Sequence, residues 1–212
     1  MRRGLRGMVR VHGWIATAGL ALLALVASGC HSGPALKDGD LVFHVSQSSQ
    51  SQAIQAATDS PYSHVGLVVH RDGQPMVLEA ISKVSLTPLA EWIARGENGH
   101  YVAKRLRDPA PLERPGVRQR MFAVGRPFLG RSYDLVFGWG DGKIYCSELV
   151  WKVYERGAGI ELCPLRKLHE FDLDDPVVAS KIAERYGDRV PLDQPVVAPS
   201  DLFDSPLLET IG

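Results

Sequence analysis

The feature that most constrains the fold is a hairpin signal at Asp72-Gly73. Apolar runs flank it, from His64 to Val69 and from Met76 to Ala80, and Asp-Gly suits the two positive φ angles of a type I′ turn. With these two residues as the whole loop, the antiparallel register sets Glu79 opposite Gly66. His64 is then the diagonal neighbour of Glu79 on the same sheet face. The turn therefore predicts a carboxylate beside an imidazole.

A second constraint is the position of Cys146. The glycine-rich segment from Gly138 to Gly142 leads into an amphipathic run that begins near Cys146 and ends before Gly157 and Gly159. This pattern predicts a helix with the cysteine in its first turn. Unpaired N–H groups and the positive end of the helix dipole favour a thiolate there, and a nearby imidazolium lowers the thiol pKa further. His64 and Glu79 thus complete a candidate Cys–His–Glu triad.

The remaining periodicities predict a mixed α+β domain. A helix with Thr87 as N-cap and Pro88 as its first residue is expected to end before Gly96. Strands are expected at 41–45 and 100–106, and further helices around 53–57, 118–124 and 177–186. No repeat or linker suggests a second domain.

The charge distribution separates the N-terminus from the rest of the chain. Four of the 24 Lys and Arg residues lie in residues 1–29, which contain no acid, so the remainder carries 20 basic and 24 acidic residues. This mildly acidic body argues against a nucleic-acid partner. The apolar run from Trp14 to Ala27 is shorter than the roughly 20 residues that a transmembrane helix needs.

These features and the sequence Ala27-Ser28-Gly29-Cys30 resemble a bacterial lipoprotein signal. The resemblance implies cleavage after Gly29, acylation of Cys30 and a periplasm-facing anchor in the outer membrane. The expected organisation is a signal peptide at 1–29, a lipidated linker at 30–37 and a hydrolase domain at 38–212. A plain secretory peptide and an uncleaved anchor remain alternatives.

Cys163 is the remaining cysteine of the expected mature domain. A disulfide with Cys146 would abolish the nucleophile. The predicted helix separates the two residues by more than the 4–7 Å Cα spacing that a disulfide needs, so both are expected to be free.

Four segments resemble the YiiX-like group of permuted papain-fold cysteine hydrolases, in the NlpC superfamily. They are Gly39-Asp40-Leu41-Val42-Phe43, residues 60–66, Leu78-Glu79-Ala80 and residues 145–151. The resemblance implies an antiparallel sheet or barrel packed against the cysteine helix, with His64 and Glu79 preceding Cys146 through circular permutation. It assigns Cys146 as nucleophile, His64 as base and Glu79 as the residue that orients the imidazole.

Other polar residues near the site have separate interpretations. The backbone N–H of Cys146 is expected in an oxyanion hole, with Tyr62 or Tyr145 as candidate side-chain donors. Glu148 falls at the third position of the cysteine helix, where a carboxylate commonly caps. The histidines show no metal-ligand spacing, so neither a metal nor another cofactor is expected.

The sequence predicts an envelope cysteine hydrolase that cleaves an amide through an acyl-thioester. Peptidoglycan stem peptide is the leading substrate, an expectation drawn from the resemblance and the compartment. A lipid acyltransferase or thioesterase is an alternative that would need an apolar tunnel beside Cys146, for which Tyr133, Phe137 and Trp139 are candidates. A non-catalytic envelope scaffold is the third possibility.

Overall fold

The computed structural model describes residues 35–211. The predicted signal peptide and Cys30 lie outside this range. The strands are β1 Leu41–His44, β2 His64–Arg71, β3 Gln74–Ala80, β4 Val84–Pro88, β5 Val102–Leu106, β6 Arg166–Lys167, β7 Pro195–Val196 and β8 Leu208–Ile211. The α-helices are α1 Ser49–Thr58, α2 Leu89–Ala94, α3 Ala110–Glu113, α4 Val117–Gly125, α5 Cys146–Ala158, α6 Pro176–Tyr186 and α7 Pro199–Phe203. Short 3₁₀ turns lie at 97–99, 126–128 and 168–170.

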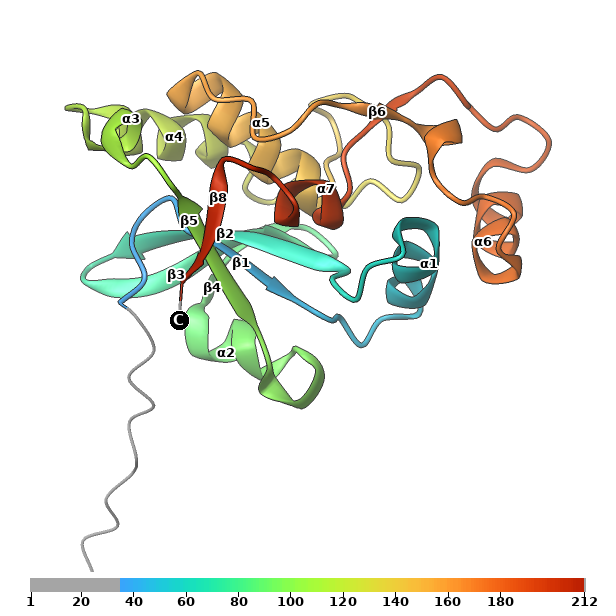
Figure 1. The fold of residues 1–212 in the computed structure, drawn as a ribbon, viewed down its shortest axis with the longest axis horizontal. Coiled ribbons are helices and arrows are strands. Elements are labelled where there is room, and N and C mark those ends of the chain that lie inside the picture. Colours follow the sequence, from blue (N-terminus) through green and yellow to red (C-terminus); the bar gives the residue numbers. More distant parts are fainter. Residues whose placement is uncertain (1–34, 212) are drawn as a thin grey trace, which may run out of the picture. The chain divides into compact units, whose positions relative to one another are not determined.

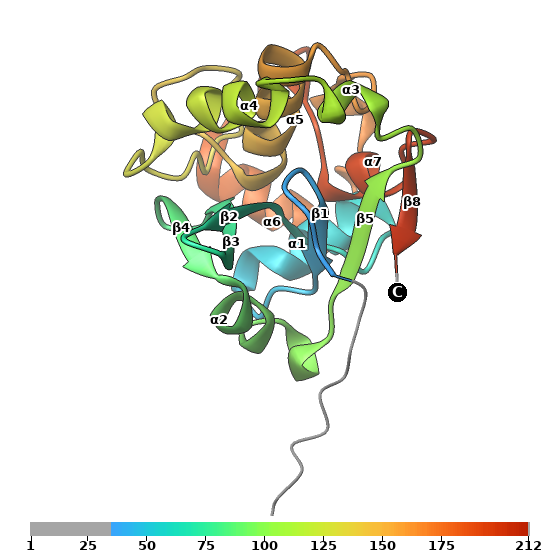
Figure 2. The same ribbon diagram turned by 90° about the vertical axis from the view of Figure 1, so that its left-hand side faces the viewer.

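One antiparallel sheet organises the domain, with the strand order β4-β3-β2-β1-β5-β8. Helices α3, α4 and α5 cover one face and α2 lies against the other, as Figures 1 and 2 show. Helix α1 packs beside α6 at one end of the sheet. The predicted α+β architecture, with a cysteine helix on an antiparallel sheet, is confirmed.

Strand alternation divides the buried side chains between these two faces. Leu41 and Phe43 of β1 belong to the larger apolar cluster, which also contains the buried side of α5. Val42, between them, belongs to a smaller cluster with Trp92 of α2. Side chains on successive strand residues point to opposite faces, so each helix layer receives every second residue.

The β2–β3 hairpin has the predicted turn and register. Asp72 and Gly73 both have positive φ, 52° and 76°, and Leu67 pairs with Leu78. Continued by one residue, this register sets Glu79 opposite Gly66. The turn chemistry therefore fixes the face on which Glu79 lies.

The segment before α2 differs from the sequence prediction. Thr87 was expected to cap a helix, but it lies in β4 and pairs with Val77 of β3. Helix α2 begins at Leu89, after Pro88. The pairing of Val84–Pro88 with β3 outweighs the local capping preference, because it extends the sheet by one strand.

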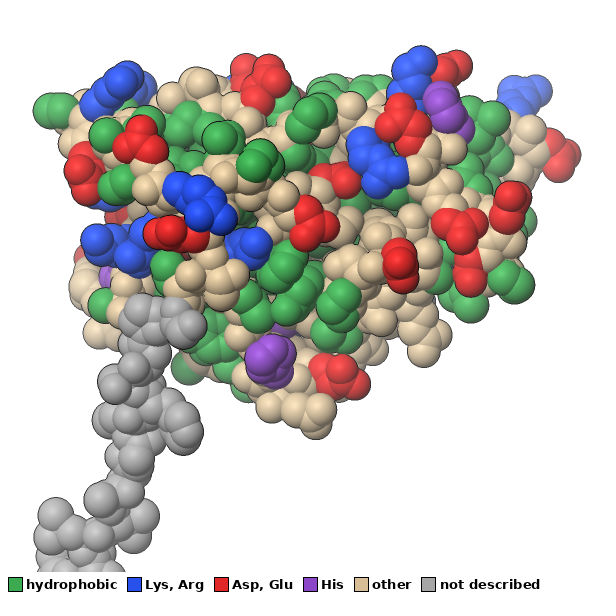
Figure 3. Space-filling view, in the orientation of Figure 1, with side chains coloured by type: hydrophobic (Ala, Val, Ile, Leu, Met, Phe, Trp, Pro, Cys, Tyr) green, Lys and Arg blue, Asp and Glu red, His purple; other side chains and the backbone are tan. Residues whose placement is uncertain are grey.

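The surface shown in Figure 3 carries basic and acidic side chains interspersed with one another. No helix within residues 35–211 is long and apolar enough to cross a membrane.

Close packing of α5 against α4 gives a first prediction. A Cβ added at Gly157 would lie 2.6 Å from the Cα of Met121 on α4, a backbone atom that cannot move aside cheaply. Gly157→Ala is expected to destabilise the domain by about 1–3 kcal/mol, although alanine is intrinsically the better helix former. Gly142→Ala is the control, since its Cβ would meet nothing within 4 Å. Urea unfolding of both variants tests this, and equal stabilities would contradict it.

Candidate active site

The cysteine helix begins at Cys146, with Tyr145 as its N-cap. Glu148 accepts a hydrogen bond from the Tyr145 backbone N–H at 3.3 Å, as its predicted capping role requires. Glu148 also pairs with Lys152 at 2.7 Å, and both side chains are buried. Burial raises the pKa of Glu148 to about 7 against the opposing effect of Lys152.

Lys152 ties the glycine-rich loop to this helix. Its ammonium group donates to the Gly140 carbonyl and to Asp141, each at 2.9 Å, besides Glu148. The loop thus lies against α5 through a buried cation.

His64 and Glu79 meet as the hairpin register predicts. Nε2 of His64 lies 2.7 Å from Oε2 of Glu79, and both side chains are buried. The other carboxylate oxygen, Oε1, accepts from the Thr87 hydroxyl at 2.5 Å and from the guanidinium group of Arg95. Burial disfavours the Glu79 carboxylate, but the bonds to His64, Thr87 and Arg95 outweigh it and lower the pKa of Glu79 to about 2.

Thr87 and Arg95 are the parts of this arrangement that sequence reasoning missed. Thr87 reaches Glu79 because it lies in β4, and a strand prediction for residues 84–88 would have placed it there. Arg95 comes from the C-terminal end of α2. No local pattern identifies it, since its contact depends on how α2 packs against the sheet.

The structure also brings His64 together with Cys146. Burial opposes the charged imidazole, but hydrogen bonding to Cys146 and then to Glu79 raises the pKa of His64 to about 9. Burial likewise opposes the thiolate of Cys146, whereas the bond to His64 and backbone N–H groups of Val65 and Ser147 lower the pKa of the thiol. The two shifts favour a thiolate–imidazolium pair.

The neighbouring His44 stays neutral beside this pair. Its ring stacks on Trp92, with centroids 4.1 Å apart, and lies 5.1 Å from the His64 ring. Burial and the charge of His64 lower the pKa of His44 to about 3. Of the two histidines, only His64, which is bonded to Glu79, carries positive charge.

The environment of Cys163 disfavours its thiolate, unlike that of Cys146. It is buried and unpaired, as Cys146 is, so the described residues contain no disulfide between them. Burial raises the pKa of the Cys163 thiol to about 12. Of the two thiols, only Cys146 has partners that stabilise its anion.

The His64–Cys146 contact gives a second prediction. Cys146→Ala removes the strongest favourable contribution to the charged imidazole, so the pKa of His64 should fall below about 9. The stabilisation from charged His64 is fully present below its ordinary pKa of 6.5 and is lost as pH rises through about 9. NMR titration of the imidazole tests this, with Cys163→Ala as the control. An unchanged pKa in Cys146→Ala would show that the two side chains do not interact.

Three tyrosines bear on the question of an oxyanion donor, and the structure gives each of them different contacts. Tyr145 accepts a hydrogen bond at its hydroxyl oxygen from the Val197 N–H at 3.2 Å, and Tyr62 stacks on Phe203 with centroids 4.2 Å apart. Tyr133 accepts from the side-chain amide of Gln50 at 2.9 Å. Burial and contact with Cys146 raise the pKa of Tyr133 well above its usual value, so its hydroxyl keeps a proton to donate.

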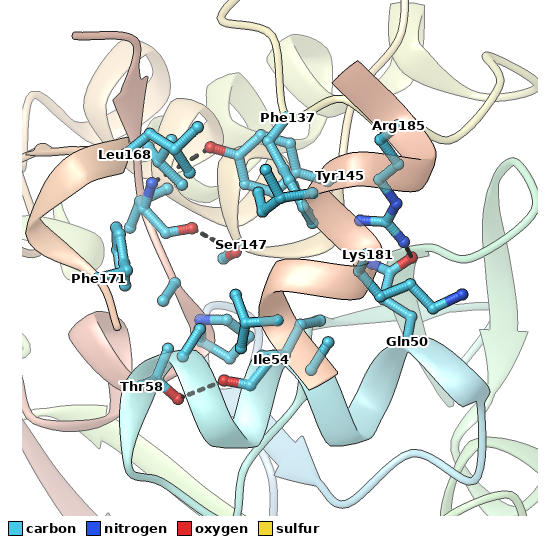
Figure 4. Close-up of a pocket in the computed structure, with 18 of the residues that line it drawn as sticks. Gln50, Ile54, Thr58, Phe137, Tyr145, Ser147, Leu168, Phe171, Lys181 and Arg185 are labelled. Carbon is cyan, nitrogen blue, oxygen red and sulfur yellow. Dashed lines mark hydrogen bonds between the residues drawn. The ribbon is translucent and has the colours of Figure 1, made fainter. Parts of the chain in front are cut away.

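Two pockets open at the site. The first, the Cys146 pocket, lies between α1, α6 and the start of α5. Its walls are mainly apolar; Figure 4 shows Leu168 and Phe171 at one end and Lys181 and Arg185 at the other. The second, the His64 pocket, is lined by serines as well as apolar residues. Gln50 and Tyr133 line both pockets.

The candidate tunnel residues are partly confirmed as pocket walls. Tyr133 and Phe137 line the Cys146 pocket. Trp139 instead packs edge-on against Trp151 of α5, with centroids 5.4 Å apart. Sequence reasoning missed Gln50 and the residues of α6, because segments near 50 and 180 meet only in the folded domain.

Comparisons with known proteins agree on the family. Residues 35–212 match the model of the permuted papain-like amidases of the YaeF/YiiX, C92 family. The chain is 45% identical over 174 residues to the uncharacterized protein YiiX of Escherichia coli K12, covering 82% of this chain and 85% of that protein. A crystal structure of the metalloprotein YiiX from Escherichia coli O157:H7 superposes with a TM-score of 0.77 at 44% identity. It covers 83% of this chain and 96% of that one.

The description of that relative as a metalloprotein raises the question of whether this site fits a metal. Across residues 35–211, no three His, Cys, Asp or Glu side chains are grouped so as to hold an ion. The Nε2 atom of His64 is already engaged by Glu79. These residues do not fit a metal ion.

Proposed function

The chain belongs to the permuted papain-like amidases of the YaeF/YiiX family, and from that premise we propose that it cleaves an amide bond with a Cys146–His64–Glu79 triad. The main support is the buried 2.7 Å contact between His64 and Glu79 beside Cys146. Glu79 orients the imidazole and stabilises its positive charge. His64 in turn holds Cys146 as the thiolate.

The proposed reaction has two steps. The Cys146 thiolate attacks the carbonyl carbon, and the oxyanion receives hydrogen bonds from the Cys146 backbone N–H and the Tyr133 hydroxyl. The imidazolium of His64 gives its proton to the leaving amine as the C–N bond breaks, which leaves an acyl-thioester. Neutral His64 then takes a proton from water, whose oxygen attacks the thioester and releases the acid and the thiolate.

The two pockets suggest how a substrate lies. Cys146 opens into the first pocket and His64 into the second. Since the nucleophile keeps the acyl group and the acid protonates the leaving group, the acyl part belongs in the Cys146 pocket. The amine belongs in the His64 pocket.

Cell-wall stem peptide remains the proposed amide substrate, supported by the lipoprotein-like N-terminus. The apolar lining of the Cys146 pocket favours a second candidate, hydrolysis or transfer of a lipid acyl group. Aliphatic and aromatic walls there suit a hydrocarbon chain better than a charged peptide stem.

Product analysis separates these functions. The domain from residue 35 would be incubated with muropeptides, with N-acyl amides and with phospholipids, and the products identified by mass spectrometry. An amidase releases an amine from one of the first two classes, and an acyltransferase moves a chain from the third. Release that persists in Cys146→Ala would contradict the thiolate mechanism. A thiol-directed probe that fails to label Cys146 would favour the scaffold alternative.

We propose further that Cys30 is acylated and anchors the domain in the outer membrane, facing the periplasm. Palmitate labelling and fractionation of the full chain test this proposal. Cys30→Ser should leave an unprocessed precursor without lipid. Unlabelled wild-type protein in the soluble periplasmic fraction would contradict it.

A further inference from the structure

Two basic side chains lie in the mainly apolar wall of the Cys146 pocket. They are Lys181 and Arg185 of α6, and no Asp or Glu lines the pocket among the residues that the structure describes. Lys181 is paired with Glu184 at 2.6 Å. Within residues 35–211, Arg185 has no carboxylate within ion-pair distance of its guanidinium group.

Arg185 is held in place by uncharged partners. One terminal nitrogen donates to Oε1 of Gln50 at 2.9 Å, a bond that Figure 4 shows across the pocket. Its guanidinium carbon lies 5.3 Å from the centre of the Phe137 ring. These contacts use one N–H and one face of the group, and the other donors have no protein acceptor in the described part of the chain. A guanidinium with free parallel N–H groups binds carboxylate or phosphate through two hydrogen bonds.

Hydrogen bonds connect this cation to the nucleophile. Arg185 donates to Gln50, Gln50 donates to the Tyr133 hydroxyl, and Tyr133 contacts Cys146. Arg185 and Cys146 thus line the same pocket and are linked through two side chains. The apolar part of the wall reduces the screening of the half-buried cation.

We propose that the acyl part of the substrate bears an anionic group, a carboxylate or a phosphate, which Arg185 binds while the adjoining apolar portion occupies the Cys146 pocket. This inference rests on the proposed function, since it names the substrate class of the same site. Lys181 adds a weaker positive contribution because Glu184 offsets its charge.

Alkylation of Cys146 tests the charge preference without requiring hydrolysis. The rates with iodoacetate, an anion, and iodoacetamide, its neutral analogue, would be measured in the wild type, Arg185→Gln, Arg185→Lys and Arg189→Gln. Arg189 is exposed and does not line the pocket, so Arg189→Gln controls for loss of one positive charge nearby. Arg185→Gln should lower the iodoacetate-to-iodoacetamide ratio roughly fivefold, and added salt should shrink the difference. Arg185→Lys should retain most of the ratio and Arg189→Gln all of it.

Protection experiments identify the anion. Hexanoate, hexyl phosphate and hexanol would be compared as protectors of Cys146 against iodoacetamide. One or both anions should protect better than the alcohol, and that advantage should disappear in Arg185→Gln. The better anion then distinguishes a carboxylate source from a phosphate source.

Two results would overturn the inference. If Arg185→Gln slows both alkylating reagents equally, Arg185 only positions Gln50 and Tyr133. An unchanged ratio in folded Arg185→Gln would also rule out anion binding by Arg185. Failure of the proposed function would give different results. Either iodoacetamide would leave Cys146 unmodified, or Cys146 would be alkylated at the normal rate while the protein released no amine from any amide.

Discussion

Cys146→Ala should lower the rate of amide hydrolysis by about 10⁴-fold or more while the domain stays folded. Alanine removes the atom that forms the acyl-thioester, and burial raises the pKa of Cys163, the other thiol within residues 35–211, to about 12. His64→Ala should cause a loss of the same order, because the thiol then lacks the group that stabilises its anion. Single-turnover acylation measured beside thermal unfolding separates lost chemistry from lost structure.

The double variant Cys146→Ala/His64→Ala should be scarcely worse than either single one. The two side chains act as a unit, so removing the second takes nothing further from the reaction. Cys163→Ala is the matched control and should keep nearly full activity. Multiplicative losses in the double variant would indicate that the two residues act independently.

Glu79→Ala should give the largest loss of stability, about 3–5 kcal/mol, because it leaves the buried His64 and the Arg95 guanidinium without their shared carboxylate. Glu79→Gln keeps the shape of the side chain and should lose less stability than Glu79→Ala. It loses the charge that stabilises the imidazolium, so its rate should fall by between about 10²- and 10⁴-fold. Glu91→Ala, an exposed acid on α2, is the stability control.

Urea unfolding and single-turnover acylation of these Glu79 variants test the expectation. The low pKa of Glu79, about 2, means that its contribution is present above its ordinary value of 4.5 and is lost as pH falls through about 2. The stability difference between wild type and Glu79→Gln should therefore shrink in acid. A wild-type rate in Glu79→Gln would remove Glu79 from the mechanism while leaving Cys146 and His64.

Local chemistry made part of this site predictable. The Asp72-Gly73 turn has one favoured geometry, and it fixes which residue of β3 faces Gly66. The start of α5 could also be predicted from the sequence, because a glycine-rich loop and an amphipathic run meet at Cys146. Both inferences used neighbours close in sequence, where backbone preferences decide the structure.

The missed residues depend on contacts between distant segments. Thr87 lies in β4, paired with β3, and does not cap a helix. Arg95 contacts Glu79 because α2 packs against the sheet. Gln50 and Arg185 meet across 135 positions of sequence. Turn and helix signals carry no information about contacts between distant segments. The pocket and its basic residues could therefore not be predicted from the sequence.

Quenching a single turnover of an amide substrate and mapping the acylated residue by mass spectrometry tests directly whether Cys146 carries the acyl group. Because His64, oriented by Glu79, activates the thiol, we expect a thioester on Cys146 in the wild type and none in His64→Ala. Acylation at Cys163, or full turnover by a folded Cys146→Ala protein, would contradict it.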